Sequence, residues 1–349
     1  MVKSVIGTPM VPCLFIFGDS LFDVGNNNNL TTKAKVNYPP YGIDFPGGVP
    51  TGRFSNGKII PDYLAEILGF DHLIPPYTNA TGEIILQGVN YASGSAGILT
   101  ETGKHLGGNM DFDKQIENHK QTVVDMFKYL DFDNMKVTKQ INKCIYAIGI
   151  GNNDYLNNYY LPDYYNSSKN YNLSQFADIL IEKYSEHIKN LVRNGARKIA
   201  IFGLGNIGCV PFVLGRHLED AIGNDWTGCI EKMNEGSAIL NNKLVDLIKN
   251  LNQTLRYTKF VYVNSSGMSA GDPSAAGFTN FNAGCCKPRD DGQCMENEKT
   301  CPDRKKYVFW DSFHPTEISN QMSAGIIFNN SVPEITFPYD IHTLATVPS

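Results

Sequence analysis

Three short polar segments each follow an apolar run of the chain and carry side chains that could act in catalysis. Ser20 lies in the first segment, Asn153 in the second, and Asp311 and His314 in the third. A serine hydroxyl is a poor nucleophile until a base takes its proton, and histidine is the side chain that most often serves as this base. Together the segments could supply a nucleophile, a base and donors to an oxyanion.

The spacing of Asp311 and His314 suits an oriented histidine. A separation of three residues in one turn brings both side chains to the same face. The carboxylate can then accept from Nδ1–H, fix the tautomer and stabilise the imidazolium that forms on taking a proton. Only His314 of the seven histidines has a carboxylate three residues before it. Such a pair also arises by chance, so taken alone it favours a solvated turn.

Two serines compete for the role of nucleophile. Ser20 comes just after an expected strand, where a turn exposes Oγ and backbone N–H groups, although a helix N-cap would also suit it. Ser269 is the centre of Gly-Met-Ser-Ala-Gly, which matches the G-x-S-x-G pattern. That pattern needs a strand directly before it and a helix directly after it. A short loop precedes Ser269 and a long Gly- and Cys-rich loop follows it, so we favour Ser20.

Strand-like runs alternate with amphipathic stretches. Strands are expected at 12–18, near 89–91, and at 144–151, 197–205 and 259–264, and a short extended run is expected at 307–310. Helices are expected at 58–69, 111–130, 174–194 with Ser174 as the N-cap, 233–251 and 318–326. This alternation predicts a parallel sheet covered on both faces, with a site at the carboxyl ends of its strands. Without a repeat or a break in composition, we expect one domain over 1–349, with its core at about 12–330.

Composition excludes several classes of protein. The 349 residues are 42% apolar and 19% charged, which excludes a disordered or fibrous chain. A net charge of −5 argues against a nucleic-acid partner. No run approaches 18 apolar residues, so no membrane span is expected.

The eight cysteines are a first indication of the compartment. Cys13 and Cys144 lie in apolar runs and are interpreted as buried thiols. Cys209 and Cys229 flank one loop that a disulfide could close, and four more cysteines crowd into 285–301. Disulfides among these six favour an oxidising compartment, while their connectivity stays open. No C-x-x-C pair is present, so a zinc site is disfavoured.

Glycosylation sequons agree with secretion. Residues 1–11 contain no apolar stretch long enough for a signal peptide, so we expect a processed or truncated chain of a secreted glycoprotein. The N-x-S/T sequons begin at Asn29, Asn79, Asn166, Asn172, Asn252, Asn264 and Asn329.

Four segments resemble a known family. FIFGDSLFDVGNNN, at 15–28, closely resembles the first block of the plant GDSL esterase/lipase family, a branch of the SGNH hydrolases. GVNYASGSAGI at 88–98 looks like its second block, IGNNDY at 150–155 its third, and FWDSFHPTE at 309–317 its fifth. Because the blocks are ordered and span most of the chain, the resemblance is specific.

The resemblance implies a role for each matched residue. Ser20 would be the nucleophile, with Asp311 and His314 completing a triad. The oxyanion would bind the backbone N–H groups of Ser20 and Gly94 and the side-chain amide of Asn153. This implies a serine esterase or lipase that forms an acyl-enzyme. An acyltransferase, or a catalytically silent binding protein, is the alternative.

The resemblance also implies the fold and the partners. The fold would be a three-layer α/β/α sandwich with a flavodoxin-like parallel five-stranded sheet. We expect a monomer that takes a small-molecule ester and needs no metal or organic cofactor. Ser95 stands where the family often has glycine, and the segment after Cys286 is poorer in glycine than is usual, which leaves substrate preference open.

Overall fold

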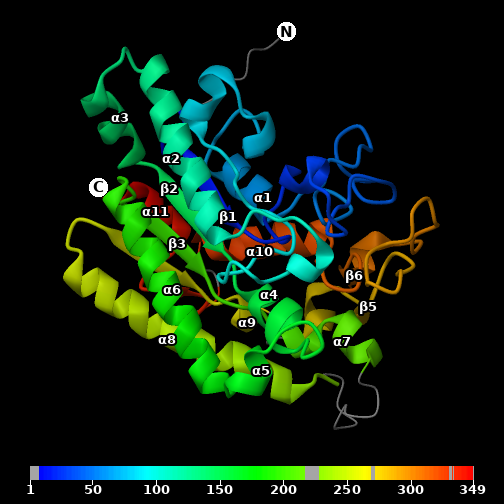
Figure 1. Ribbon diagram of the computed structural model, residues 1–349. Helices are drawn as coiled ribbons and strands as arrows, with labels where there is room; N and C mark the ends of the chain where they lie inside the picture. The colour runs from blue at the N-terminus through cyan, green and yellow to red at the C-terminus, as the bar shows by residue number, and fades with distance from the viewer. Residues whose placement is uncertain (1–7, 217–227, 269–271, 330–331, 333, 349) are drawn as a thin grey trace.

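The computed structural model describes residues 8–216, 228–268, 272–329, 332 and 334–348. A central sheet lies between two layers of helices (Figure 1). One face is covered by α2 (Phe112–Tyr129), α6 (Leu173–Arg193) and α8 (Glu231–Thr254). The other face is covered by α1 (Ile60–Ile67), α10 (Glu317–Asn329) and α11 (Ile341–Thr346). The expected three-layer α/β/α architecture is confirmed.

The main sheet has five strands in the order β1-β2-β3-β4-β7. The first four strands are parallel, and β7 pairs antiparallel with β4. Their bounds are Leu14–Gly18 for β1, Ile145–Gly149 for β2, Lys198–Phe202 for β3, Lys259–Val263 for β4 and Thr336–Phe337 for β7. A separate two-stranded sheet pairs β5 (Asn280–Gly284) with β6 (Tyr307–Phe309).

Shorter helices connect these elements and lie mostly near the carboxyl ends of the strands or at the edges of the layers. They are α3 (Asn134–Ile141), α4 (Asn152–Asp154), the π-helical turn η5 (Tyr155–Tyr159), α5 (Ser167–Asn170), α7 (Pro211–Arg216) and α9 (Ser265–Met268). None of the helices in the described part of the chain combines the length and the apolar composition needed to cross a bilayer.

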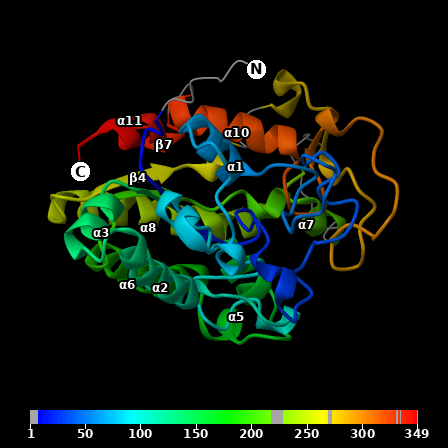
Figure 2. The ribbon, with the colours of Figure 1, turned by 90° about the horizontal axis from the view of Figure 1, so that it is seen from above.

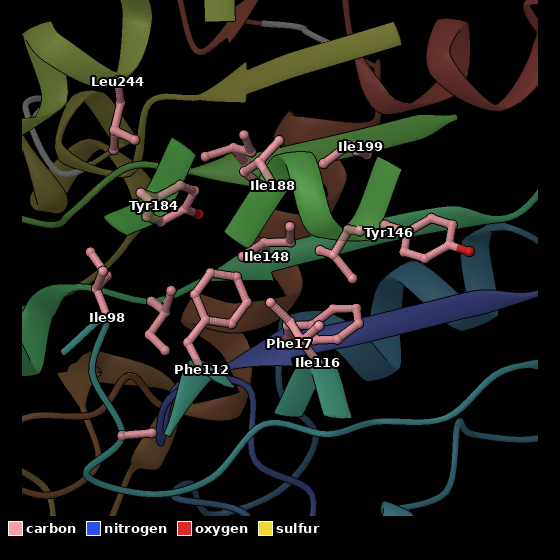
Figure 3. Close-up of a cluster of buried hydrophobic side chains, with 14 of the residues drawn as sticks. Phe17, Ile98, Phe112, Ile116, Tyr146, Ile148, Tyr184, Ile188, Ile199 and Leu244 are labelled. Atoms are coloured by element: carbon pink, nitrogen blue, oxygen red, sulfur yellow. The ribbon is translucent and has the colours of Figure 1, made fainter. Parts of the chain in front are cut away.

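The strands are apolar on both faces because both faces are covered. In β1, Phe15 and Phe17 pack toward α2 and α6, while Leu14 and Ile16 pack toward the opposite layer. Figure 3 shows the first of these cores, where Phe17 from β1 and Phe112 from α2 lie among aliphatic side chains of the sheet and helices. This alternation fixes the strand register, since a slip of one residue would exchange the two faces.

The helix boundaries follow from local capping. Asp111 accepts a hydrogen bond from the Lys114 N–H at the start of α2. The expected cap at Ser174 is wrong by two residues. Asn172 is the N-cap of α6, and its side chain and that of Gln175 bond reciprocally to each other's backbone N–H.

One strand prediction needs correction, and the expected extended run at 307–310 belongs to a different sheet. The segment around 89–91 is not a strand of the sheet, although the Val89 carbonyl and the Tyr91 N–H both bond to Ile16 in β1. The run 307–310 forms β6 of the small sheet instead of the main one. The fifth place in the main sheet is taken by β7, whose two residues are too few for an apolar pattern to reveal.

All eight cysteines form disulfides. The interpretation of Cys13 and Cys144 as free thiols is wrong, because they are bonded to each other where β1 and β2 begin. The predicted closure of the loop between Cys209 and Cys229 is confirmed. The remaining pairs are Cys285 with Cys301 and Cys286 with Cys294.

Candidate active site

Ser20 lies in the turn that follows β1, at the carboxyl edge of the sheet. Gly18 lets the end of β1 lie close to β2, because a Cβ at this position would lie 2.5 Å from the carbonyl oxygen of Gly149. The side chain of Gln115 in α2 bonds to both the N–H and the carbonyl of Gly18. The strand end before Ser20 is therefore held on both sides, and Ser20 itself remains partly exposed.

His314 lies between Ser20 and Asp311. Its Nε2 is 2.7 Å from the Ser20 Oγ, and its Nδ1 is 2.8 and 2.9 Å from the two carboxylate oxygens of Asp311. With the Nδ1 proton directed at the carboxylate, the serine hydroxyl donates to Nε2. The ring of Phe54 packs against the imidazole at 4.7 Å between ring centres. The structure thus brings the predicted serine, histidine and aspartate into one chain of hydrogen bonds.

Asp311 is buried and heavily bonded. Its Oδ1 accepts from the N–H groups of Phe313 and His314, each at 2.8 Å. Its Oδ2 accepts from the hydroxyl of Tyr41 at 2.7 Å. Sequence reasoning missed Tyr41, because it lies in the long loop between β1 and α1, where no periodicity marks a contact with a residue 270 positions away.

Asn153 lies in α4, directly after β2, and lines the same cavity as Ser20. Its amide nitrogen donates to the carbonyl of Ala96 at 3.0 Å, and its oxygen accepts from Asn157 at 2.6 Å. A side-chain amide has two N–H bonds, so one remains for a ligand. The two partners fix the orientation of this amide.

Asp154 holds the backbone of a neighbouring loop. Its carboxylate accepts from the N–H groups of Ile98 and Leu99 and from the Thr102 hydroxyl. Complete burial raises its pKa to about 7 in spite of these bonds. It ties the loop after Gly97 to the end of β2.

The amide of Gly94, expected in the oxyanion hole, is occupied. It donates to Oδ2 of the buried Asp23 at 3.0 Å, so it is not free in this structure. The next residue, Ser95, lines the cavity together with Ser20 and Asn153. Ser95 has a φ of 64°, and its N–H has no acceptor among the described residues. The N–H of Gly97 also has no acceptor among the described residues, but Ser95 lines the cavity and Gly97 does not, so the amide of Ser95 is the better placed of the two.

A second carboxylate, Asp19, lies beside Ser20. It is buried, its Oδ1 accepts from the Leu21 N–H, and its Oδ2 has no partner in the described part of the chain. Burial raises the pKa of Asp19 to about 6, and the charge of His314 opposes that rise. Burial likewise raises the pKa of Asp23 to about 6.

The cavity above Ser20 has a volume of about 2210 Å³. Its floor includes Ser20, Ser95, Asn153 and His314. Large parts of its wall are apolar, among them Leu21, Ile60, Leu156, Phe202, Met268, Phe313, Met322 and Ile326. The competing serine, Ser269, lies outside the described residues.

One family of enzymes matches nearly the whole chain. The sequence profile of the GDSL-like lipase/acylhydrolase family matches residues 14–325, and the chain belongs to this family. It is 46% identical over 346 residues to the GDSL esterase/lipase At4g18970 of Arabidopsis thaliana, covering 97% of this chain and 94% of that protein. It is 45% identical to the GDSL esterase/lipase At1g29660 of the same plant over 348 residues, covering 98% and 93% of the two chains. The family resemblance of the sequence blocks is thereby confirmed.

Proposed function

We propose that this protein is a serine esterase that cleaves carboxylic esters through an acyl-enzyme on Ser20. The observation that carries the proposal is the distance of 2.7 Å between His314 Nε2 and Ser20 Oγ, with Asp311 on the other ring nitrogen. A base within hydrogen-bond reach of the nucleophile, itself oriented by a carboxylate, is the arrangement that activates a hydroxyl.

In the first half of the reaction, His314 takes the Ser20 proton as Oγ attacks the ester carbonyl. Asp311 stabilises the imidazolium that results. The imidazolium then gives its proton to the departing alcohol. In the second half, water attacks the acyl-enzyme with the same histidine as base, and the carboxylic acid leaves. Every proton transfer uses groups of this chain.

The oxyanion would be held by three donors. We assign them to the N–H of Ser20, the N–H of Ser95 and the side-chain amide of Asn153. Ser95 replaces Gly94 in this assignment because the Gly94 N–H already donates to Asp23. Removal of one such donor typically costs about 3 kcal/mol of transition-state stabilisation.

The same acyl-enzyme permits acyl transfer if a second alcohol reaches it before water does. The cavity is large enough to hold an acyl group and an acceptor alcohol together, and this size is the observation that supports acyl transfer as a second candidate function. Ester consumption and free acid release, measured with and without candidate alcohols, separate the two. Equal amounts under all conditions rule out transfer.

We infer that the protein is secreted and glycosylated. The four disulfides fit an oxidising compartment. Among the sequon asparagines, Asn29, Asn79, Asn166, Asn172 and Asn329 are exposed.

A fluorophosphonate probe tests the central assignment. The probe phosphonylates an activated serine, and peptide mapping identifies the labelled residue. Labelling of Ser20 that is lost in Ser20→Ala and kept in Ser269→Ala supports the proposal. Labelling that survives Ser20→Ala and disappears in Ser269→Ala overturns it.

A further inference from the structure

Tyr41 reaches the candidate active site from the loop between β1 and α1, outside the family's sequence blocks. It is buried, and its hydroxyl donates to Asp311 Oδ2 at 2.7 Å. The same hydroxyl oxygen accepts the N–H of Cys294 at 3.1 Å. A backbone N–H can only donate, so the single hydroxyl proton is left for the carboxylate. The direction of the bond to Asp311 is thereby fixed.

The surroundings of Tyr41 hold its ring in place. Tyr38, Phe54 and Trp310 each pack edge-on against it, at 5.4 to 6.5 Å between ring centres. Cys294 is fully buried and joined to Cys286. The cysteine-rich loop therefore supplies the amide that orients the tyrosine hydroxyl.

We propose that Tyr41 is a positioning residue that holds the Asp311 carboxylate and weakens its pull on the Nδ1 proton of His314. The inference rests on the proposed function of Ser20 and His314. A hydrogen bond from a hydroxyl to a carboxylate spreads the negative charge onto the donor. With the hydroxyl removed, the carboxylate would stabilise the imidazolium more strongly, and the base form would require a higher pH.

Other charged groups near this pair stay in place when the hydroxyl is removed. The charge of the buried Asp19 acts on His314. The charge of the Asp311 carboxylate also acts on Tyr38, and Tyr38 lies beside the ion pair of Arg289 and Asp291. A change in the pH dependence of activity can therefore be attributed to the lost hydrogen bond between Tyr41 and Asp311.

The test compares Tyr41→Phe with Tyr38→Phe. Tyr38 is the matched control, because its hydroxyl bonds to the same loop, at Gln293 and the Cys294 carbonyl, without contacting Asp311. We measure kcat, KM and the rate of phosphonylation by a fluorophosphonate between pH 5 and 9. For Tyr41→Phe we expect kcat to fall about tenfold with KM nearly unchanged. The acidic limb of the pH–rate profile should move to higher pH by about one unit. Tyr38→Phe should keep the wild-type limb.

Three outcomes bear on the proposal in different ways. If wild-type protein is labelled at Ser20 but the acidic limb of Tyr41→Phe coincides with that of wild type, the positioning role is wrong while the esterase proposal stands. If wild-type protein is not labelled at Ser20, the proposed function itself fails. A loss of thermal stability in Tyr41→Phe without a shifted limb would mark a purely structural residue and overturn the inference.

Discussion

The imidazole of His314 lies within hydrogen-bond distance of the Ser20 hydroxyl although 294 residues separate them in the chain. The parallel sheet makes this possible. Ser20 follows β1 and Asn153 follows β2, and neighbouring parallel strands end at the same edge. His314 reaches that edge from the loop between β6 and α10. Figure 2 shows α10, which follows this loop, side by side with α1 in one layer.

Asn153→Ala tests the oxyanion assignment. The substitution removes a donor that would act mainly in the transition state, so kcat should fall about 100-fold with a small change in KM. Steady-state kinetics with a soluble ester measure both constants. Asn157→Ala removes only the partner of the Asn153 oxygen, and we expect a smaller loss. Equal activity of wild type and Asn153→Ala would remove this residue from the site.

The cavity wall along α10 predicts a preference for aliphatic chains. Ser319, Met322 and Ile326 line the cavity at helical spacing, over about 10 Å from the helix start near His314. We expect Ile326→Trp to lower kcat/KM for long-chain p-nitrophenyl esters severalfold while sparing the acetate. Gln321→Trp, at an exposed position of the same helix outside this wall, should leave the ratio unchanged. An unaltered chain-length profile in Ile326→Trp would show that the chain binds elsewhere.

The raised pKa of the buried Asp154 predicts how the free energy of unfolding depends on pH. Its pKa is about 7 in the folded protein and about 3.9 in an unfolded chain, so between these values the folded state holds a proton that the unfolded state has released. The stabilisation is complete below about pH 4 and is lost as pH rises through 7, by up to about 4 kcal/mol. Denaturant unfolding from pH 4 to 8 should show a flatter decline in Asp154→Asn than in wild type. The exposed Asp178→Asn should keep the wild-type slope, and identical slopes in all three would contradict the prediction.

The sequons differ in accessibility. The half-buried side-chain amide of Asn252 bonds to both the N–H and the carbonyl of Phe260 at 3.0 Å, which engages its donor and its acceptor. Asn79 and Asn166 are exposed. In material secreted from eukaryotic cells, glycopeptide mass spectrometry should find glycan on Asn79 or Asn166 and none on Asn252. Glycan on Asn252 would contradict the prediction.

The sequence predicts those parts of the site that lie in local motifs. Ser20, Asn153 and His314 each follow an apolar run of the sequence. These three runs form the strands β1, β2 and β6. The contacts of Tyr41 could not be predicted in this way, because they depend on how two long loops pack together. The same holds for the pairing of Cys13 with Cys144, since an apolar run looks alike around a thiol and a disulfide.

The loop that contains Gly94 and Ser95 shows a second limit of prediction from the sequence. Gly94 and Ser95 are neighbours, and the motif alone cannot tell which amide is free. The structure separates them, because Asp23 from the first block binds one of the two amides. A buried carboxylate that accepts from a loop 71 residues away leaves no periodic trace in the chain.

Catalysis by the proposed triad requires Ser20 and His314 to act as one unit, and a double-mutant cycle measures this directly. Purified Ser20→Ala, His314→Ala and the double variant are compared with wild type by kcat/KM on one ester. Groups that act together lose nearly the same factor whether one or both are removed. We predict three closely similar losses of at least about 1,000-fold. Losses that multiply in the double variant, or a Ser20→Ala protein with wild-type activity, would contradict the proposed triad.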